Sequence, residues 1–263
     1  MQTKCVLITG FSSPIAKSCA KLLALHGFCV VGTGTKDEHF EESFRILKLD
    51  LCEKGSIQAL ICRLKELNLS PQYLINNAGI GLEPSSLIDV DEDLFLKVFY
   101  VNTIKPFSLI RELVKEFPLK KIVNVGSVMS LLPLPFYGVY GASKSAFLDL
   151  TLSLRYELLN KEISVCAVIP NLTATDFIKH RIEVLSQDEY FSNKVSYIRE
   201  LNKKSSKKAD KPLKVVKVLV KVILKKSPQA VFYVGIKGYI SALLAKILPQ
   251  RLLYFFLTKI FKL

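Results

Sequence analysis

Tyr140 and Lys144 stand four residues apart in a segment, 139–159, whose spacing predicts a helix, so their side chains share one helix face. A tyrosine hydroxyl has a pKa near 10 and exchanges protons poorly at neutral pH unless its surroundings change that value. The lysine charge favours the phenolate, and a shift of about three pKa units requires about 4 kcal/mol. The pair could serve as an acid/base group, although two such residues by themselves are more often a solvated helix face.

The elements that must position this pair are short apolar runs alternating with helical patterns. The runs 4–9, 28–33, 44–49, 73–75, 121–125 and 163–169 predict strands, and 12–26, 53–67 and 91–117 predict further helices, the last kinked at Pro106. Strands that are apolar throughout and joined by helices indicate a parallel sheet covered on both faces. We therefore predict an α/β fold with a doubly wound, Rossmann-type sheet.

Length and composition limit the organisation of the chain. With 263 residues, 50% of them hydrophobic, the chain is too apolar for disorder and long enough for one large domain. We predict a single domain over 1–238, with a mobile substrate lid at about 176–211, a basic helix over 211–226 and a last strand over 230–234. A C-terminal amphipathic helical extension is predicted over 239–263. The first apolar run meets Gly10 at once, unlike a secretory signal, so we expect a cytoplasmic protein.

The cysteines and histidines do not indicate a metal site. The chain has three histidines and six cysteines with no CxxC pair, namely Cys5, Cys19, Cys29, Cys52, Cys62 and Cys166. A zinc site needs clustered ligands of these types, so no metal is predicted. Buried, reduced thiols are the simpler interpretation.

The turn 9–16 follows the first predicted strand and opens the first helix. Free backbone N–H groups and the helix dipole make such a turn suited to bind a phosphate. Gly10 is the only glycine of the three that this kind of nucleotide-binding turn usually carries. An ordinary strand-to-helix turn therefore remains an equal alternative for this segment alone.

Five separated motifs together change this balance. They are the turn 9–16, the segment 76–79 (Asn-Asn-Ala-Gly), Asn102, Ser127 with the segment 140–144 thirteen residues later, and the segment 170–175. In this order and spacing the set resembles the short-chain dehydrogenase/reductase family over about residues 3–180. The resemblance implies an enzyme that transfers a hydride between a nicotinamide cofactor and a ketone or secondary alcohol.

The resemblance also implies a role for each matching residue. The pyrophosphate turn would comprise Thr9, Gly10, Ser12, Ser13 and Ile15; Asp50 would lie at the adenine edge, Asn76 and Ala78 near the adenosine ribose, and Thr175 at the nicotinamide carboxamide. Tyr140 would be the acid/base, and Lys144 would also hold the nicotinamide ribose. Ser127 would bind the substrate oxygen, and Asn102 would anchor a water linked to Lys144. Tyr137 is a competing phenol with the wrong spacing to both Ser127 and Lys144.

The sequence departs from the family pattern at two positions of the phosphate-binding turn, and the charges after the second strand indicate which cofactor is preferred. Pro14 and Ala16 occupy the second and third glycine positions; alanine should be tolerated, whereas the proline removes an N–H and puts cofactor affinity in question. The second strand is followed by Thr35 and Lys36 without an acid until Asp37, and an acid at this place would repel a 2′-phosphate. We predict that Thr35 and Lys36 receive a 2′-phosphate, so NADP(H) is the preferred cofactor and NAD(H) is the alternative. The alternative for Lys36 is a solvated lysine in a loop.

The last quarter of the chain carries the basic charge. Of the formal net charge of +14, a net of +10 falls from Lys194 to Lys226, and +5 falls from Lys237 to Leu263, where no acid occurs. The segments 239–248 and 251–263 are apolar, basic and too short to span a bilayer, so we predict contact with an anionic membrane surface. Docking of this extension on the domain or across a dimer is the alternative. Nucleic acid is a weaker interpretation, because the lysines are interleaved with aliphatic residues.

Two functional hypotheses from different classes follow. The first is an NAD(P)-dependent oxidoreductase acting on a small lipophilic carbonyl or alcohol substrate of the sterol, retinoid or long-chain type. The second is a non-catalytic nucleotide sensor or scaffold, which Pro14 and Ala16 favour and the four matching catalytic positions oppose. The resemblance further implies a homodimer formed through the helices 91–117 and 139–159.

Overall fold

The computed structural model describes residues 4–174, 180–206 and 209–263. In this part of the chain eight strands form one sheet in the order β3-β4-β2-β1-β5-β6-β7-β8, and only the pairing of β3 with β4 is antiparallel. The strands are β1 (Cys5–Ile8), β2 (Cys29–Gly34), β3 (His39–Glu41), β4 (Phe44–Lys48), β5 (Pro71–Asn76), β6 (Lys121–Val125), β7 (Ser164–Ile169) and β8 (Val231–Tyr233). The strand order runs outward in both directions from β1 and β5, which confirms the predicted doubly wound α/β fold.

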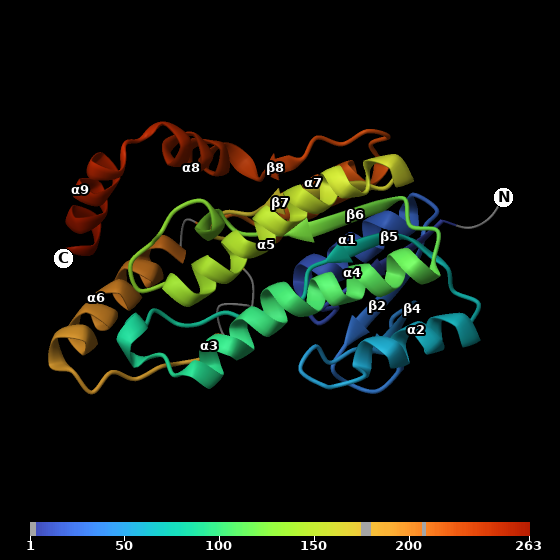
Figure 1. Ribbon diagram of the computed structural model, residues 1–263, viewed down its shortest axis with the longest axis horizontal. Helices are drawn as coiled ribbons and strands as arrows, with labels where there is room; N and C mark the ends of the chain where they lie inside the picture. The colour runs from blue at the N-terminus through green and yellow to red at the C-terminus, as the bar shows by residue number, and fades with distance from the viewer. Residues whose placement is uncertain (1–3, 175–179, 207–208) are drawn as a thin grey trace.

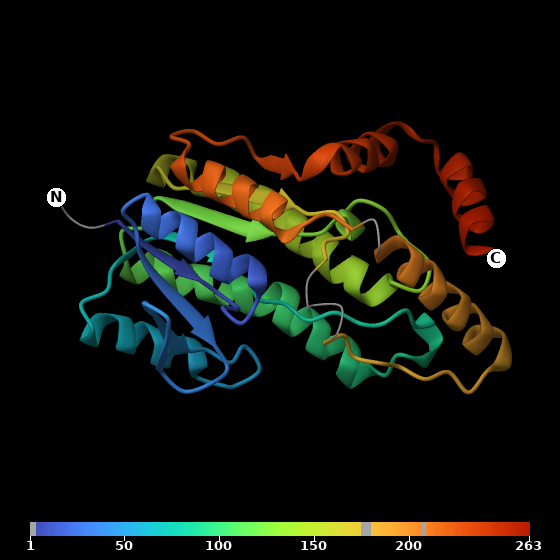
Figure 2. The same cartoon turned by 180° about the vertical axis from the view of Figure 1, so that it is seen from behind.

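Helices cover both faces of the sheet (Figures 1 and 2). One face is covered by α1 (Pro14–Leu25) and α7 (Pro212–Leu224), and the other by α2 (Ser56–Glu66), α4 (Lys105–Glu116) and α5 (Gly138–Glu157). Carboxyl ends of parallel strands meet at one edge of such a sheet, and the reversal of strand order opens a crevice there. The loops after β1, β5 and β6 therefore lie close together.

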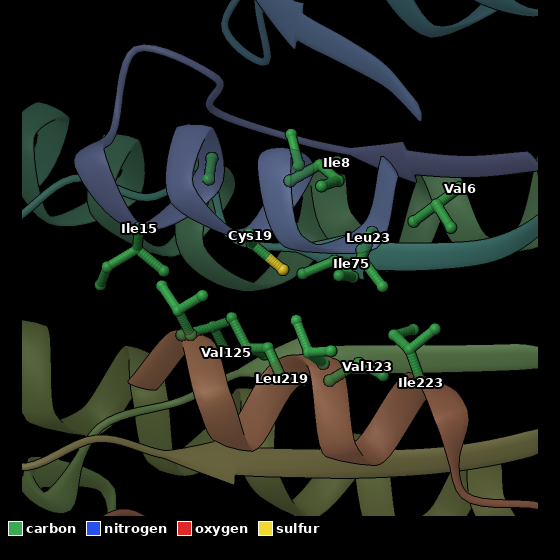
Figure 3. Packing of buried hydrophobic residues seen from close by; sticks show 14 of the residues in the cluster. Val6, Ile8, Ile15, Cys19, Leu23, Ile75, Val123, Val125, Leu219 and Ile223 are labelled. Atoms are coloured by element: carbon green, nitrogen blue, oxygen red, sulfur yellow. The ribbon is translucent and has the colours of Figure 1, made fainter. Parts of the chain in front are cut away.

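The core lies on both faces of the sheet because successive strand residues point to opposite sides. On β1, Val6 and Ile8 belong to the cluster with α1 and α7, whereas Cys5 and Leu7 belong to the cluster with α2 and α4. Figure 3 shows the first cluster, in which Leu219 and Ile223 of α7 face the strands and α1. Strands buried on both sides need apolar residues throughout, which explains the continuous apolar runs.

The predicted helix 91–117 is one helical run with an irregular middle. Asp91 caps α3 (Glu92–Phe99) by accepting a hydrogen bond from the Leu94 N–H at 2.7 Å. A π-helical segment, η2 (Tyr100–Ile104), separates α3 from α4, and Pro106 stands in the first turn of α4. Because proline has no N–H to continue the α-helical bonding, the wider turn lies where the sequence predicts a kink.

Three features differ from the sequence expectations. The short edge strand β3 was not predicted; it forms a hairpin with β4 in which Glu42 has a φ of 55°. The segment expected to be a mobile lid contains the helix α6 (Glu189–Ser206), which extends into the polar run after Asn202. The second helix begins three residues later than predicted, at Ser56, after Gly55 in the left-handed region.

The C-terminal extension forms α8 (Gly235–Ile247) and α9 (Gln250–Phe261), an arch that reaches beyond the sheet and returns to α6 (Figures 1 and 2). Phe261 is buried in a cluster with Ile198 of α6 and Tyr137. The side chain of Lys194 donates to the carbonyl of Lys262. Among the described residues no helix is long and apolar enough to cross a bilayer.

Candidate active site

Helix α5 carries the predicted acid/base pair, with Tyr140 and Lys144 one turn apart. Tyr140 is half-buried, and only 5% of Lys144 is exposed. The ammonium of Lys144 donates to the carbonyl of Val125, the last residue of β6, at 3.3 Å. A methyl group on Gly79 would lie 3.4 Å from the same ammonium. The pair therefore faces the loops that follow β5 and β6.

Ser127 completes this group from the end of β6. Its side chain is hydrogen-bonded with the side chain of Tyr140. It also accepts a hydrogen bond from the Met129 N–H at 3.2 Å and thereby begins the short 3₁₀ helix η3 (Val128–Ser130). This cap fixes the backbone that presents the serine, so the structure brings Ser127, Tyr140 and Lys144 together.

The protonation of Tyr140 differs from the sequence expectation. Burial raises the pKa of Tyr140, and the hydrogen bond with Ser127 and the positive charge of Arg181 act in the opposite direction. The net shift is upward because desolvation of the phenolate outweighs both. Burial also lowers the pKa of Lys144 to about 8, so its ammonium form persists at neutral pH.

Arg181 is a charge near the tyrosine that the sequence did not single out. It is half-buried and precedes Ile182, whose N–H donates to the carbonyl of Gly81 at 2.9 Å and whose carbonyl accepts from the Glu83 N–H at 2.9 Å. This pairing fixes the arginine segment beside the loop after β5. The positive charge of Arg181 lowers the pKa of Tyr140 from this segment.

Removing this charge gives a testable pH effect. Arg181→Gln is expected to raise the pKa of Tyr140 further, since the arginine charge lowers it. If Tyr140 is the acid/base that the resemblance implies, alcohol oxidation requires its phenolate, and the acid limb of the pH profile should move to higher pH. Arg111→Gln, at an exposed arginine of α4 paired with Glu112, is the matched control and should leave the profile in place. An unchanged profile for Arg181→Gln would exclude an electrostatic action on the tyrosine.

Asn102 lies fully buried in the π-helical segment and connects three parts of the site. Its amide accepts from the Ile80 N–H and donates to the Ile80 carbonyl, both at 2.9 Å, and donates to the Ser143 hydroxyl at 3.1 Å. It thus joins the loop after β5 to the helix of Tyr140. Its role in anchoring a water stays a prediction.

The turn after β1 is held against the loop after β5. Gly10 has a φ of +68°, and a methyl group there would lie 2.9 Å from the Ala78 Cα, so only glycine fits. The hydroxyl of Thr9 accepts from the N–H groups of Asn77 and Ala78, both at 3.0 Å. The Asn77 amide donates to the carbonyls of Thr9 and Gly10 at 3.1 and 3.2 Å.

Helix α1 begins directly after this turn. Ser13 is the N-cap and accepts from the Ile15 N–H at 3.2 Å, while Pro14 occupies the first helical turn, where proline is favoured. Ser12 is exposed at the turn, and Ile15 is buried. Ala16 is buried in the core cluster, so the helix packs closely without a glycine there.

The residues beside this turn suit a dinucleotide. The hydroxyl of Thr33, near the carboxyl end of β2, is buried and has no hydrogen-bond partner among the described residues. Thr35 and Lys36 are exposed beyond the same strand end, and one Asp50 carboxylate oxygen accepts from the Cys52 N–H at 2.8 Å. An unpartnered hydroxyl and a glycine-only turn at a helix start suit a ribose and a pyrophosphate.

Two predicted cofactor residues require separate comment. The Asn76 amide is buried and donates to Asn124 at 2.9 Å, and Asn124 donates to Thr151 at 2.8 Å. The Asn76 side chain therefore links β5 to β6 and α5, and its contact with the ribose stays a prediction. Thr175 lies outside the described residues.

Comparison with known proteins decides the family. Residues 4–184 match the family model described as short chain dehydrogenase. The chain belongs to the short-chain dehydrogenase/reductase family. This confirms the resemblance carried by the five motifs, and the chain is accordingly an oxidoreductase of this family.

Individual short-chain dehydrogenases and reductases resemble the chain over most of its length. A 3-ketodihydrosphingosine reductase from Bacteroides thetaiotaomicron is 26% identical over 234 residues, which cover 87% of this chain and 86% of that protein. A short-chain dehydrogenase from Streptomyces avermitilis has a similar structure, with a TM-score of 0.80, 19% identity and 92% coverage of both chains. A 4-hydroxyisoleucine dehydrogenase complexed with NADH has a TM-score of 0.70 and 27% identity, and the match covers 89% of this chain and 97% of that one.

Sequence analysis of this short-chain dehydrogenase missed Asn77, Ser143, Arg181 and Thr33. Asn77 stands inside a recognised motif, and its amide holds the turn after β1. Ser143 lies between Tyr140 and Lys144 and could have been noticed as a polar residue facing the same helix side. No local signal marks Arg181 or Thr33, because their places depend on pairing with distant segments.

Proposed function

We propose that this short-chain dehydrogenase is an NAD(P)-dependent oxidoreductase that interconverts a ketone and a secondary alcohol with Tyr140 as the acid/base. The convergence of Tyr140, Ser127 and Lys144 beside the glycine turn of β1 carries this proposal. When bound, a nicotinamide cofactor supplies or accepts the hydride. The protein residues bind the substrate oxygen and move its proton.

The protonation state of the site favours ketone reduction. Tyr140 has a raised pKa and is therefore protonated at neutral pH, as the acid of a reduction must be. The Ser127 hydroxyl lies beside it and would donate a hydrogen bond to the oxygen as negative charge develops. The ammonium of Lys144 stabilises that charge and holds the ribose hydroxyls. After proton transfer, the half-buried tyrosine regains a proton from water.

The surroundings of β2 support NADP(H) over NAD(H). Asp37 pairs with Lys48 at 3.1 Å, and Glu38 pairs with Arg45 and Arg63 at 2.5 and 2.6 Å. Asp37 and Glu38, the two acids that follow Lys36, are therefore paired with other cations. Lys36 could then bind the 2′-phosphate of NADP(H). Such a contact is charge-assisted and distinguishes the two cofactors.

Fluorescence titration with NADPH and with NADH tests both the function and the preference. We expect tighter NADPH binding, and Lys36→Glu should weaken NADPH at least about tenfold while NADH changes little, because one charged contact contributes about 1.4 kcal/mol or more. Lys54→Glu, at an exposed lysine outside the strand end, is the control. NADPH oxidation with a panel of long-chain ketones then tests turnover. A preference for NADH would reject the role of Lys36 and leave the oxidoreductase intact.

The surface of α8 and α9 supports a lipophilic substrate at an anionic membrane. Apolar side chains of both helices are exposed, including Ile240, Leu243, Ile247, Phe255 and Phe256. No acidic residue follows Asp210 in the sequence, so the cations on these helices are not opposed by neighbouring carboxylates of the segment. Apolar and cationic groups on one short helix pair suit the interface of an anionic bilayer. A 3-ketodihydrosphingosine reductase among the relatives adds long-chain amino ketones as one candidate class.

Co-sedimentation with vesicles tests the membrane proposal. We expect the protein to bind phosphatidylglycerol-containing vesicles, less so at high salt, and not pure phosphatidylcholine. The double variant Leu243→Glu and Ile247→Glu places acids at side chains that are 57% and 68% exposed and should abolish binding. Leu159→Glu, at a 70% exposed position outside the extension, is the matched control. Full binding by the double variant would reject this surface as the membrane contact.

A homodimer through the two long helical runs is also part of the proposal. Leu96 is exposed on α3, Tyr100 and Ile104 are exposed on η2, and Leu150 is exposed on α5. An apolar row of this kind on neighbouring helices suits a two-fold interface between copies.

One observation supports the second hypothesis of a nucleotide sensor or scaffold. Pro14 leaves the first turn of α1 without one backbone N–H, which weakens a phosphate site. If neither nucleotide binds in the titration, the non-catalytic scaffold replaces the oxidoreductase, and the nucleotide sensor is excluded as well.

A further inference from the structure

Two cysteines lie side by side at the amino ends of β1 and β2, far from the active-site edge of the sheet. Cys5 and Cys29 are direct register partners in the parallel pair, and the Cys29 N–H donates to the Lys4 carbonyl at 2.9 Å. Register partners in a sheet point to the same face. Both belong to the side covered by α2 and α4, where Cys5 is part of the core cluster and Cys29 packs against it.

The two thiols have unequal surroundings. Cys5 is 4% exposed, whereas Cys29 is only half-buried. A hydrogen bond joins the two side chains; it raises the pKa of Cys5 and lowers the pKa of Cys29 to about 6. Cys29 is thus the accessible thiolate and Cys5 the buried thiol beside it. Of the other cysteines, Cys52 and Cys62 are exposed.

We propose that Cys5 and Cys29 form a reversible oxidation site that reduces a hydroperoxide and closes as a disulfide between β1 and β2. The Cys29 thiolate attacks one peroxide oxygen, the O–O bond breaks, and the departing oxygen takes a proton and leaves as water or alcohol. Cys29 is then a sulfenic acid. The Cys5 sulfur displaces its hydroxyl, which leaves as water with the thiol proton. The two thiols lose two electrons, and the peroxide gains them.

Strand geometry permits this bond. Neighbouring strands lie about 4.8 Å apart, within the range of about 4.4–6.8 Å that disulfides allow between Cα atoms. A bond imposed on a fixed register is less relaxed than one between free loops, so reducing thiols should open it readily. The site does not depend on the proposed oxidoreductase activity, because the two cysteines lie at the opposite ends of the strands.

Peptide mapping of the whole protein after brief hydrogen peroxide treatment tests the proposal. Trypsin would release Cys5 on the peptide 5–17 and Cys29 on the peptide 22–36. We expect these two peptides to be linked before Cys52 or Cys62 is oxidised, and dithiothreitol to separate them. Sulfinic acid on Cys29 with a free Cys5 thiol, or earlier oxidation of Cys52 or Cys62, would overturn the proposal.

The pH dependence of iodoacetamide labelling gives a second test. In the reduced wild-type protein the midpoint for Cys29 should lie near pH 6, and Cys5→Val should move it towards the ordinary value of about 8.5, because the donor thiol is gone. Cys62 labelling is the internal control and should not change. An unmoved Cys29 midpoint would contradict the proposed partnership.

Discussion

Replacing Tyr140 by Phe is expected to lower kcat for ketone reduction by about 10²- to 10⁴-fold, the usual contribution of a positioned general acid. The change removes only the hydroxyl that is hydrogen-bonded with Ser127. The ring remains to fill the half-buried space on α5, so folding and nucleotide binding should persist. Steady-state NADPH oxidation and the nucleotide Kd, measured on the same preparation, check both expectations.

Tyr137→Phe is the matched control for this result. Tyr137 is a buried phenol three residues earlier, and its hydroxyl accepts a hydrogen bond from the Asn202 amide of α6 at 2.5 Å. Its loss should cost about 1 kcal/mol of stability and leave kcat almost unchanged. If Tyr140→Phe retained full turnover, the acid/base assignment would be wrong. If both variants lost turnover equally, the phenols would matter for structure rather than for chemistry.

Lys144→Met is expected to abolish turnover and yet stabilise the fold. Burial lowers the pKa of Lys144 from 10.5 to about 8, so the folded state holds a desolvated ammonium with one long hydrogen bond to Val125. This shift corresponds to as much as about 3 kcal/mol of unfavourable energy at neutral pH. Methionine matches the length of the side chain without the charge. Urea unfolding at pH 7 should show the higher free energy of unfolding.

The pH dependence of this gain follows from the direction of the shift. Between pH 8 and 10.5 the unfolded chain binds a proton that the folded protein lacks, so the wild-type free energy of unfolding rises through this window. The advantage of Lys144→Met should be full below pH 8 and vanish above about pH 10.5. A constant advantage across this range would rule out the buried charge as its cause.

Lys121→Met provides the contrasting control. Lys121 is also buried, but its ammonium donates to the carbonyls of Val222, Ile223 and Lys225, at 3.0, 2.8 and 2.5 Å, at the C-terminal end of α7. Removing it leaves these groups without their donor, which should destabilise the fold by about 2 kcal/mol or more. If Lys144→Met raises the free energy of unfolding and Lys121→Met lowers it, the first lysine is kept for function and the second for stability.

The strands and helices were predictable because each is specified locally. The run from Lys121 to Val125 is apolar except at Lys121 and Asn124, and Ser13 and Pro14 mark a helix start. β3 has three residues, too few for a pattern, and its pairing with β4 depends on the turn at Glu42. The π-helical segment lies beside Pro106, where the sequence predicts a kink. The bonds of Asn102 with Ile80 and Ser143, by contrast, have no local sequence signal.

The placement of the candidate site residues could be predicted where a residue type and a spacing recur together, while their roles stay predictions. Tyr140, Lys144 and Ser127 meet as expected, whereas the upward shift of the Tyr140 pKa was not expected. Protonation depends on how deeply a group is buried and on charges such as Arg181, which arrive from distant segments. The sequence contains Tyr140 and Arg181, but it does not indicate that the two side chains come close together in the folded protein.

The hydrogen bonds among Thr9, Gly10 and Asn77 keep the turn after β1 and the loop after β5 ordered before any ligand binds. Four hydrogen bonds, from the two N–H groups onto Thr9 and from the Asn77 amide, hold the two loops together within the protein itself. A loop that is ordered only on ligand arrival loses conformational freedom in every cycle and subtracts that loss from affinity. Here the freedom is given up once, when the chain folds. In the proposed oxidoreductase, successive nucleotides would exchange at a turn that is already ordered, and turnover would not wait for the loop to form.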